Sequence, residues 1–448
     1  MKPRPPSMRL FFAAYSLLWA VVLPLVLVYF LRRGRKDPLY ARHLAERFGT
    51  VPAPLPGAVW VHTVSLGEFR SAVPLLMALL ARGERLHITC MTPAGRREAE
   101  TILADRIASG AAIVTWLPLD MAWTCRRFLK AAQPKAGILM EMEFWPRLIE
   151  TADRLGVPVF FGNAQYPEKT FQRDNRITRP LGRAMGLAAG AMVKSDLQRE
   201  RFSARGVAPV HVTGELRFDQ PVPAHLVRAG QALRESLHAA ARPVVTIASA
   251  IEGEDDLLAA AIRMTRELQP ETLFVYVPRA PERFDRVAAI LQDAGLAVLR
   301  RSDALGPDLG PKGDLPDDVQ VLLGDSMGEM YAYLAMADRV IVGGGFVPKG
   351  AHNISEPLAL SKPVWVGAHI WTIAYPAQEA LAAGVLQILP NDPAKIAAAM
   401  TTGPAAPDDD VRAFFADHAG ALDKTLAAFD ALMRGAASPD AASSAPRP

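Results

Sequence analysis

The sequence predicts an α/β protein in which two Rossmann-like domains face each other across a cleft, with an N-terminal membrane-anchor helix in front of them. Three observations support this prediction. Short apolar, β-rich runs alternate with helical patterns in two separate series, a proline-bearing link divides the two series, and residues 10–31 are almost uniformly apolar. With 448 residues, 50% of them hydrophobic and 21% charged, the chain has the composition of a globular protein of two or three domains.

The apolar stretch at residues 10–31 is long enough to span the hydrocarbon core of a bilayer. A cleaved signal peptide would need a shorter apolar core and a small-residue cleavage site, whereas this stretch runs straight into the basic segment RRGRK; residues 1–36 are therefore predicted to be a membrane anchor and its basic flank. That flank suits anionic lipid headgroups. The basic residues before the stretch nearly balance those after it, so charge does not decide whether the helix spans the bilayer or lies in the interface, kinked at Pro24.

The first domain is expected at residues 37–222. Its strand-like runs include AVWVHTVS at 58–65 and RLHITCMT at 85–92, and the series continues to VHVTGEL at 211–217, with helical patterns between the runs. Short buried strands separated by helices predict a parallel sheet with helices on both faces.

The second domain is expected at residues 223–407. After the proline-bearing link the alternation restarts with VVTIASA at 244–250, TLFVYVP at 272–278 and VQVLLGD at 319–325. Residues 408–435 are predicted to form one last helix, with acidic residues at its N-terminus as dipole partners rather than as a metal site. The tail at 436–448 is poor in apolar residues and is expected to be disordered.

Two joined domains of this kind are the arrangement of GT-B glycosyltransferases, in which ligands bind outside the carboxyl ends of the strands. The segment VGGGFVPKGAHNISEPLALSKPVWVG at 342–367 offers a strand, a glycine turn at 343–345 and a helix that starts near Glu356, with Lys349 as an added cation. This pattern predicts a phosphate site built from backbone N–H groups, or, with equal weight, an ordinary glycine-rich turn.

Composition excludes several other classes. A net charge of +4 is small for this length and gives no nucleic-acid footprint. Cys90 and Cys125 have no metal-ligand spacing, so neither a disulfide framework nor a zinc site is expected.

Nine ordered motifs resemble the 3-deoxy-D-manno-octulosonic acid (Kdo) transferase family, from the anchor to about residue 400. They are DPLYARHLAERFG, VHTVSLGEFRSAVPL, MTPAGRREA, LMEMEFWPRLI, VTGELRFD, SAIEGEDD, PRAPERF, GDSMGEMYAYLAMAD and GGGFVPKGAHNISEP. The resemblance implies an inverting, metal-independent transferase that needs no cofactor and moves Kdo from CMP-Kdo to lipid IVA in lipopolysaccharide biosynthesis. It also implies a single anchor in the bacterial inner membrane, catalytic domains on the cytoplasmic face, the acceptor on the first domain and the donor on the second.

The resemblance assigns donor contacts in the second domain. Arg279 suits an anion because its guanidinium can donate in a bidentate fork. Glu329 and Glu356 could accept from ribose hydroxyls or the cytosine amino group, or could instead only cap helix N-termini. The full set implied by the resemblance is Pro278, Arg279, Met327, Gly328, Glu329, Asn353, Ile354, Ser355 and Glu356.

The resemblance also assigns catalytic residues in the first domain. Glu68, just past a strand end and at the start of a helix, is the expected general base, although a helix N-terminus lowers the pKa of a carboxyl and the residue could be only a dipole partner. Glu141 corresponds to a glutamate that supports the transition state, and spacing does not decide between it and Glu143. Arg217 stands where the family has lysine, with the same charge and a different geometry.

The chain departs from the family at Ala280, at Ala351, in NISE and in NAQYPEKT. These changes leave two alternatives open. One is another GT-B transferase with a different nucleotide sugar and lipid acceptor, and the other is an anchored nucleotide-sugar-binding protein with weakened catalysis. No visible motif sets the number of Kdo residues added.

Overall fold

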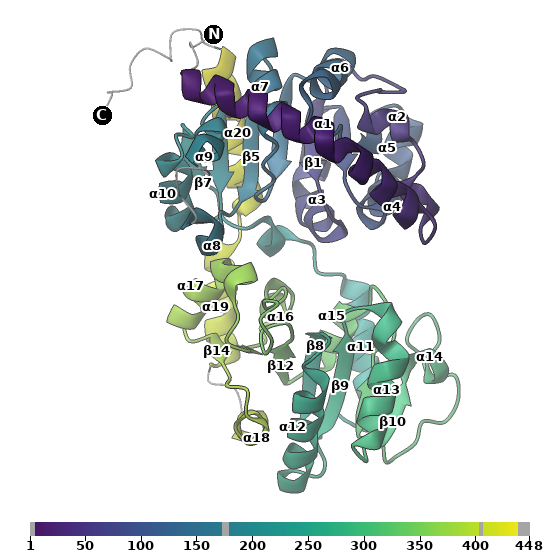
Figure 1. The fold of residues 1–448 in the computed structure, drawn as a ribbon. Coiled ribbons are helices and arrows are strands. Elements are labelled where there is room, and N and C mark those ends of the chain that lie inside the picture. The colour runs from purple at the N-terminus through teal and green to yellow at the C-terminus, as the bar shows by residue number, and fades with distance from the viewer. Residues whose placement is uncertain (1–4, 173–178, 403–405, 438–448) are drawn as a thin grey trace. The chain divides into compact units, whose positions relative to one another are not determined.

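The structure is a computed structural model that describes residues 5–172, 179–402 and 406–437 (Figure 1). The chain forms two compact units. The first comprises Met1–Gln220 and Gly420–Pro448, and the second comprises Pro221–Ala419. Each unit contains a seven-stranded parallel sheet with helices around it, which confirms the predicted α/β fold class.

The sheet of the first unit has the strand order β3-β2-β1-β4-β5-β6-β7, and every pair is parallel. Its central strands are buried along their whole length, because helices cover both faces. The strands are β1 (Val59–Thr63), β2 (Leu86–Cys90), β3 (Ala112–Trp116), β4 (Ala136–Met140), β5 (Val159–Ala164), β6 (Gly190–Val193) and β7 (Val210–Val212).

Two apolar cores lie on the two faces of this sheet. One joins Val61 and Ile88 to Phe69 of α3, and the other joins Trp60 and Phe161 to Phe128 of α6. The helices are α2 (Leu44–Arg47), α3 (Leu66–Ala81), α4 (Pro93–Ile102), α5 (Ala104–Ala108), α6 (Ala122–Ala132), α7 (Pro146–Leu155), α8 (Glu168–Phe171), α9 (Arg179–Met185) and α10 (Asp196–Ala204), with 3-10 turns η1 (Pro38–Tyr40) and η2 (Leu216–Asp219).

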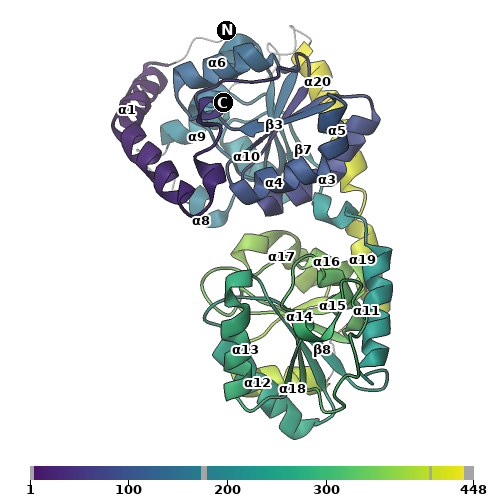
Figure 2. The same cartoon turned by 90° about the vertical axis from the view of Figure 1, so that its right-hand side faces the viewer.

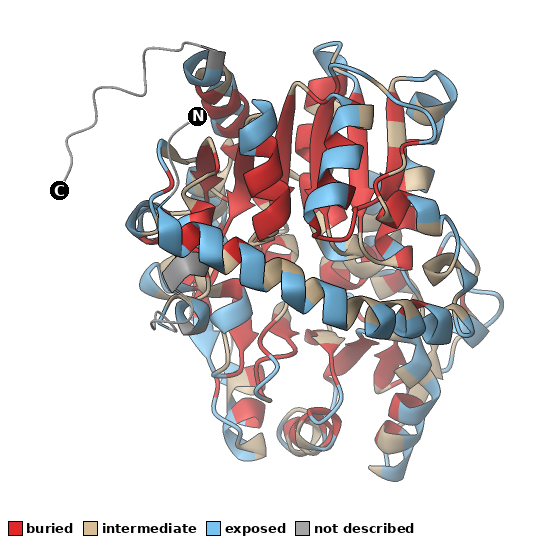
Figure 3. Cartoon of the chain, turned by 45° about the horizontal axis from the view of Figure 1, so that its top comes forward, coloured by how far each residue is buried: buried red, intermediate tan, exposed pale blue. Residues whose placement is uncertain are grey.

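The predicted anchor forms helix α1 (Pro6–Gly34), with Pro24 inside it. Within the described residues it is the one helix long and apolar enough to cross a membrane. In the structure α1 runs along the surface of the first unit (Figures 1 and 3).

The sheet of the second unit has the order β10-β11-β9-β8-β12-β13-β14, again with parallel pairs. Figure 2 shows α12, α13 and α18 beside this sheet. The strands are β8 (Val244–Ala250), β9 (Leu273–Pro278), β10 (Val298–Arg300), β11 (Val321–Leu323), β12 (Arg339–Val342), β13 (Val364–Val366) and β14 (Leu386–Ile388). The helices are α11 (Ala224–Ser236), α12 (Asp255–Leu268), α13 (Phe284–Asp293), α14 (Arg301–Ala304), α15 (Met330–Met336), α16 (Ser355–Ala359), α17 (Ala374–Ala382), α18 (Pro393–Thr402) and α19 (Asp408–His418), with 3-10 turns η3 (Pro281–Arg283) and η4 (Trp371–Ile373).

The single C-terminal helix expected at 408–435 is two helices. Helix α19 belongs to the second unit, and α20 (Ala421–Ala437) returns to the first. Gly420 breaks the helix with a φ of 79°, and the Asp219 carboxylate accepts the N–H groups of Gly420 and Leu422. The expected tail at 436–448 lies outside the described residues from 438 onward.

Candidate functional site

Glu68 lies in the first turn of α3, directly after β1, at the carboxyl edge of the first sheet. The N-cap residue Ser65 accepts the N–H of Glu68 at 3.4 Å, and Glu68 Oε2 accepts the N–H of Val64 at 2.6 Å. The two bonds satisfy donors at the start of the helix, in the manner of a capping box. Glu68 therefore stabilises the N-terminus of α3, as the alternative role of a helix-dipole partner required.

Burial gives the Glu68 carboxyl an unusual acidity. Desolvation raises its pKa to about 8, the N–H of Val64 acts in the opposite direction, and the negative charges of Glu143 and Glu141 add to the increase. The expected lowering by the helix N-terminus is thus outweighed by burial. A carboxyl with a pKa near 8 populates both proton forms close to neutral pH, which is what a general base requires.

Glu141 follows β4 directly, in a left-handed conformation with a φ of 56°. Its Oε1 accepts from Nδ2 of Asn163 at 3.0 Å, and its Oε2 accepts from Nζ of Lys194 at 2.7 Å. Burial raises the pKa of Glu143, two residues on, to about 7; a hydrogen bond with the Trp145 side chain acts in the opposite direction, and the charge of Glu141 adds to the increase. Glu141 is the carboxylate held in place by a positive charge.

Lys194 connects Glu141 to a second carboxylate. Its Nζ lies 2.7 Å from Oε2 of Glu215, Asn163 Nδ2 donates to Oε1 of Glu215 at 2.9 Å, and a guanidinium nitrogen of Arg217 lies 3.8 Å from the same carboxylate. Burial alone would raise the pKa of Glu215, but the charges of Lys194 and Arg217 outweigh it and hold that pKa well below its usual value. The result is a buried, ionised network.

These groups meet because they end or follow strands that are neighbours in one parallel sheet. The expected residues Glu68, Glu141 and Arg217 lie at this carboxyl edge, together with three residues that the sequence patterns did not indicate. The available signal was positional, since each missed residue lies at the end of a predicted strand or just beyond it. The six residues are Glu68 after β1, Glu141 after β4, Asn163 in β5, Lys194 after β6, and Glu215 and Arg217 after β7.

Arg279 lies at the carboxyl edge of the second sheet, directly after the buried Pro278 that ends β9. Its backbone N–H donates to the carbonyl of Ala250 at 2.9 Å, and a guanidinium nitrogen lies 2.8 Å from Nδ1 of His352. Burial lowers the pKa of His352 to about 4, and the charge of Arg279 adds to this, so the imidazole is neutral and Nδ1 accepts. The exposed guanidinium is therefore oriented without being neutralised by that imidazole.

The glycine turn at 343–345 is not an open phosphate cradle. The carboxylate of the buried Glu254, which precedes α12, accepts the N–H of Gly344 at 2.8 Å and that of Phe346 at 3.0 Å. The expectation that the N–H groups of this turn await an anion is therefore wrong for Gly344. Burial raises the pKa of Glu254, against the effect of these backbone hydrogen bonds.

The glycines of this turn serve close backbone packing instead. A Cβ atom on Gly343 would lie 2.7 Å from Cα of Ala250, and one on Gly345 would lie 2.8 Å from the nitrogen of Gly367. Any larger residue would push β12 away from its neighbours β8 and β13.

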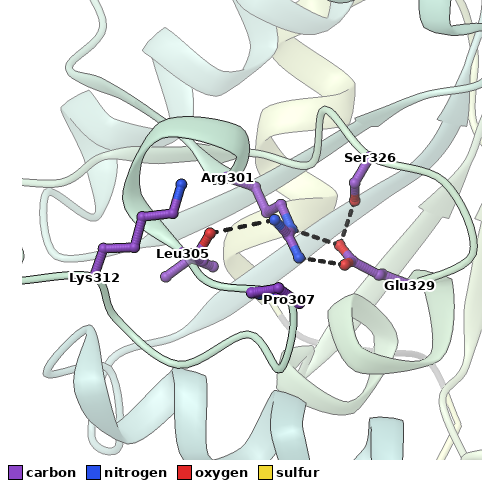
Figure 4. Close-up of a pocket in the computed structure, with 6 residues that line it drawn as sticks. All are labelled: Arg301, Leu305, Pro307, Lys312, Ser326 and Glu329. Atoms are coloured by element: carbon purple, nitrogen blue, oxygen red, sulfur yellow. Dashed lines mark hydrogen bonds and ion pairs between the residues drawn. The ribbon is translucent and has the colours of Figure 1, made fainter.

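Glu329 precedes α15 and lines a cavity of about 520 Å³ (Figure 4). Arg301 donates to Oε2 at 2.8 Å and to Oε1 at 2.5 Å, and Ser326 and Tyr333 also donate to Oε2. Burial would raise the pKa of Glu329, but these hydrogen bonds and the charge of Arg301 lower it. Three donors occupy Oε2, so Oε1 is the oxygen better placed to accept from a ligand. The cavity is lined by Arg301, Leu305, Pro307, Lys312, Ser326 and Glu329.

The segment expected to contact the donor before α16 is largely built into the fold. Asn353 Oδ1 accepts the N–H of Ser355 at 3.0 Å and its hydroxyl at 2.7 Å, so Asn353 orders the start of α16. Ile354 and Ser355 are buried, and Glu356 is half-buried in the first helical turn. Polar recognition here would therefore involve Asn353, Glu356 and the backbone.

Other groups at this edge of the second sheet are exposed. Met327 has 58% of its surface exposed, Gly328 has a φ of 87°, and Lys349 Nζ lies 3.3 Å from the carbonyl of Glu252. Lys312, a further cation, also lines the cavity to which Glu329 belongs (Figure 4). This edge thus combines cations with hydrogen-bonding groups.

The two carboxyl edges have different chemistry. The first presents Glu68 and Glu143, whose raised pKa values suit proton removal from a hydroxyl, and a separate buried lysine that is paired with Glu141. The second presents Arg279 and Lys349, which suit an anionic ligand. Over the described ranges, no group of three or more His, Cys, Asp or Glu side chains could hold a metal ion.

Comparison with known proteins gives concordant results. A family model described as 3-Deoxy-D-manno-octulosonic-acid transferase (kdotransferase) matches residues 42–220. The 3-deoxy-D-manno-octulosonic acid transferase of Bordetella pertussis is 37% identical over 93% of this chain and 98% of its own length, and that of Haemophilus influenzae is 31% identical over 79% and 82%. A glycosyltransferase from Rickettsia africae has the same fold, with a TM-score of 0.54 at 10% identity over 86% of this chain and all of that one.

Proposed function

The chain belongs to the Kdo transferase family, and from this premise we propose that it moves Kdo from CMP-Kdo to lipid IVA, with inversion at the anomeric carbon. The reaction is a glycosyl transfer in lipopolysaccharide biosynthesis. It takes place at the bacterial inner membrane, with both units on the cytoplasmic face and one N-terminal anchor. The observation that supports this proposal most directly is the position of Glu68 beside Glu141 and Glu143 at a carboxyl edge, partly withdrawn from water.

In the proposed mechanism Glu68 removes the proton from an acceptor hydroxyl. The resulting oxygen attacks the anomeric carbon of Kdo, the bond from that carbon to the phosphate oxygen breaks, and CMP leaves with the electron pair. A single displacement of this kind inverts the configuration. The proton ends on the Glu68 carboxylate and is then released to water.

Arg279 is proposed to stabilise the charge that develops on the departing phosphate, because an oriented guanidinium donates charge-assisted hydrogen bonds to anions. Glu329 and Glu356 are proposed to recognise the nucleoside through ribose hydroxyls or the cytosine amino group. Pro278, Met327, Gly328, Asn353, Ile354 and Ser355 complete the proposed donor site.

Glu141 and Arg217 are proposed to support the transition state within the network of Lys194 and Glu215. The Lys194 ammonium between two carboxylates fixes the position of Glu141 at the edge where the sugar acid reacts. Lys194 is thus the buried cation of this network, and Arg217 is its partly exposed cation.

Mass spectrometry of lipid IVA after incubation with the purified full chain and CMP-Kdo tests the proposal. We expect products heavier by one or more Kdo residues, with none formed from UDP-sugars. Transfer from a UDP-sugar instead would indicate a different GT-B transferase. Donor binding without any product would indicate a nucleotide-sugar-binding protein, and either result overturns the proposal.

A further inference from the structure

Helix α1 has a continuous contact face against the first unit. Its buried and half-buried residues recur every three or four positions along the whole helix, which is the period of one helical face. Near the start, Met8 and Phe12 pack against Ala184 of α9, and near the end Phe30 packs against Leu119 and Met121. The contact face comprises Met8, Phe11, Phe12, Tyr15, Ser16, Trp19, Val22, Leu23, Val26, Leu27, Phe30 and Gly34.

Polar contacts make this docking specific. The hydroxyl of Tyr15 donates to the carboxylate of Asp120 at 2.8 Å, and Arg147 donates to the carbonyl of Phe12 and, at 2.5 Å, to the hydroxyl of Ser16. Asp120 and Arg147 are buried, with at most 9% of their surface exposed. Without α1, Asp120 and Arg147 would each lose partners supplied by that helix.

A transmembrane position of α1 would be costly on both sides. Tyr15 lies within the apolar stretch, where hydrocarbon offers its hydroxyl no hydrogen-bond partner. Arg147 would lose two of its acceptors, although Glu150 would stay 3.3 Å away. The lost hydrogen bonds of α1 and those of Arg147 both favour the docked helix over a helix that leaves the unit to span a bilayer.

The opposite face of α1 is apolar and uncovered (Figure 3). A continuous apolar surface of this length on a soluble protein marks a site for a membrane or a partner. Its large residues, with their exposed fractions, are Leu10 at 72%, Leu17 at 69%, Leu18 at 56%, Val21 at 67%, Leu25 at 68%, Val28 at 46% and Leu31 at 57%.

Basic residues lie on both sides of the apolar stretch in nearly equal number, namely Lys2, Arg4 and Arg9 before it and Arg32, Arg33, Arg35 and Lys36 after it. A helix that crosses the inner membrane normally has its basic residues concentrated on the cytoplasmic side. Basic residues at both ends instead match an anionic lipid surface that contacts both ends at once.

We propose that α1 lies in the plane of the membrane, between the first unit and an anionic lipid surface, and does not cross the bilayer. Its contact face stays on the unit and its outward face enters the boundary between headgroups and acyl chains. The inference depends on the proposed membrane location. Asp120 lies between β3 and α6, and Arg147 lies in the first turn of α7, which follows β4. Because both residues lie beyond the carboxyl ends of these strands, α1 lies at the same sheet edge as Glu141.

Cysteine labelling in native membranes tests the topology. Ser7→Cys and Lys36→Cys place a thiol at each end of α1, and the parent chain is the matched control because Cys90 and Cys125 are buried. A membrane-impermeant maleimide is applied to spheroplasts and to inside-out inner-membrane vesicles. We expect both variants to react in the same preparation. Reaction of the two variants in opposite preparations would mean a spanning helix and overturn the inference.

Depth measurements provide a second readout on the full chain in phosphatidylglycerol-containing vesicles. Nitroxide labels at Leu10, Leu17, Val21 and Val28 should all show the same shallow depth, from their accessibility to oxygen and to a water-soluble nickel complex. A spanning helix would instead give a maximum depth near Val21. Flotation of the unlabelled chain with the vesicles is the control, and a chain left in the lower fraction refutes membrane attachment. Kdo transfer is assayed separately in detergent, so that the proposed activity is tested independently of membrane attachment.

Discussion

Lys194 and Glu215 form a buried ion pair in which Nζ lies 2.7 Å from Oε2, with 4% and 2% of the two side chains exposed. The same Nζ lies 2.7 Å from Glu141. A lone charge in such a position is strongly unfavourable, so each member of the network depends on the others.

Replacement of Lys194 by Met should therefore destabilise the chain severely. We expect the free energy of unfolding to fall by about 3 to 5 kcal/mol, because Glu215 and Glu141 lose their shared cation. Urea denaturation measures this, with the exposed Lys130→Met as the control of the same chemistry. Equal, small effects of the two substitutions would show that the network contributes little to stability.

Glu68→Gln should abolish most of the activity and leave the fold intact. The amide oxygen can still accept from Val64 N–H, but it cannot remove a proton, so Kdo transfer should fall by roughly a hundredfold or more. CMP affinity should not change. The exposed Glu200→Gln is the control, and near-parental transfer by Glu68→Gln would exclude Glu68 as the base.

The pH dependence of transfer should report the same carboxyl. With a folded-state pKa of about 8, Glu68 is mainly protonated at pH 6.5, so kcat/KM should rise as pH increases toward 8. A flat profile between these values would contradict the assignment.

The same shift has an effect on stability with a definite sign. Because the folded-state pKa lies above the ordinary value of 4.5, the folded state holds its proton where the unfolded state has released it. The Glu68 contribution to stability is thus lost as pH rises from about 4.5 to 8. Relative to Glu68→Gln, the parent chain should become less stable over this window, as measured by thermal unfolding.

Arg279→Ala should weaken CMP binding by about 1.5 to 3 kcal/mol, the typical value for a hydrogen bond to a charged group. Calorimetry with CMP measures this. Arg286→Ala, which removes an exposed arginine from α13 of the same unit, should bind CMP like the parent chain. Unchanged affinity in Arg279→Ala would remove this arginine from the donor site.

Glu254→Ala should destabilise the chain through the glycine turn. The N–H groups of Gly344, Phe346 and Ile251 would lose their acceptor, at a cost of about 1 to 3 kcal/mol for each group left buried and unpaired. The comparison is Glu267→Ala, on the exposed side of α12. A loss below 1 kcal/mol would mean that water replaces the carboxylate.

Sequence patterns predicted both parallel sheets, because continuous apolar runs between helical patterns are typical of strands buried on both faces. They also placed Glu68 and Arg279 at strand ends. They missed Lys194, Asn163 and Glu215, since the pairing of these residues depends on the order of β5, β6 and β7 in space, which no linear spacing encodes.

Two other differences between the expected and the observed structure involve residues that the sequence patterns already contained. Glu254 lies within SAIEGEDD, but its bonds to the glycine turn join segments 90 residues apart. The break between α19 and α20 coincides with Gly420, whose left-handed φ is a common helix ending. The helical pattern continues on both sides of Gly420, so one helix was expected instead of two.

The return of α20 to the first unit has a consequence for protein synthesis. Leu426, Phe429 and Leu432 are part of the same apolar core as Val59 and Ile88, yet they are translated after the entire second unit. A nascent first unit therefore lacks part of one core until α20 has been translated. The second unit is one continuous segment, Pro221–Ala419, so its whole core is translated before the core of the first unit is complete.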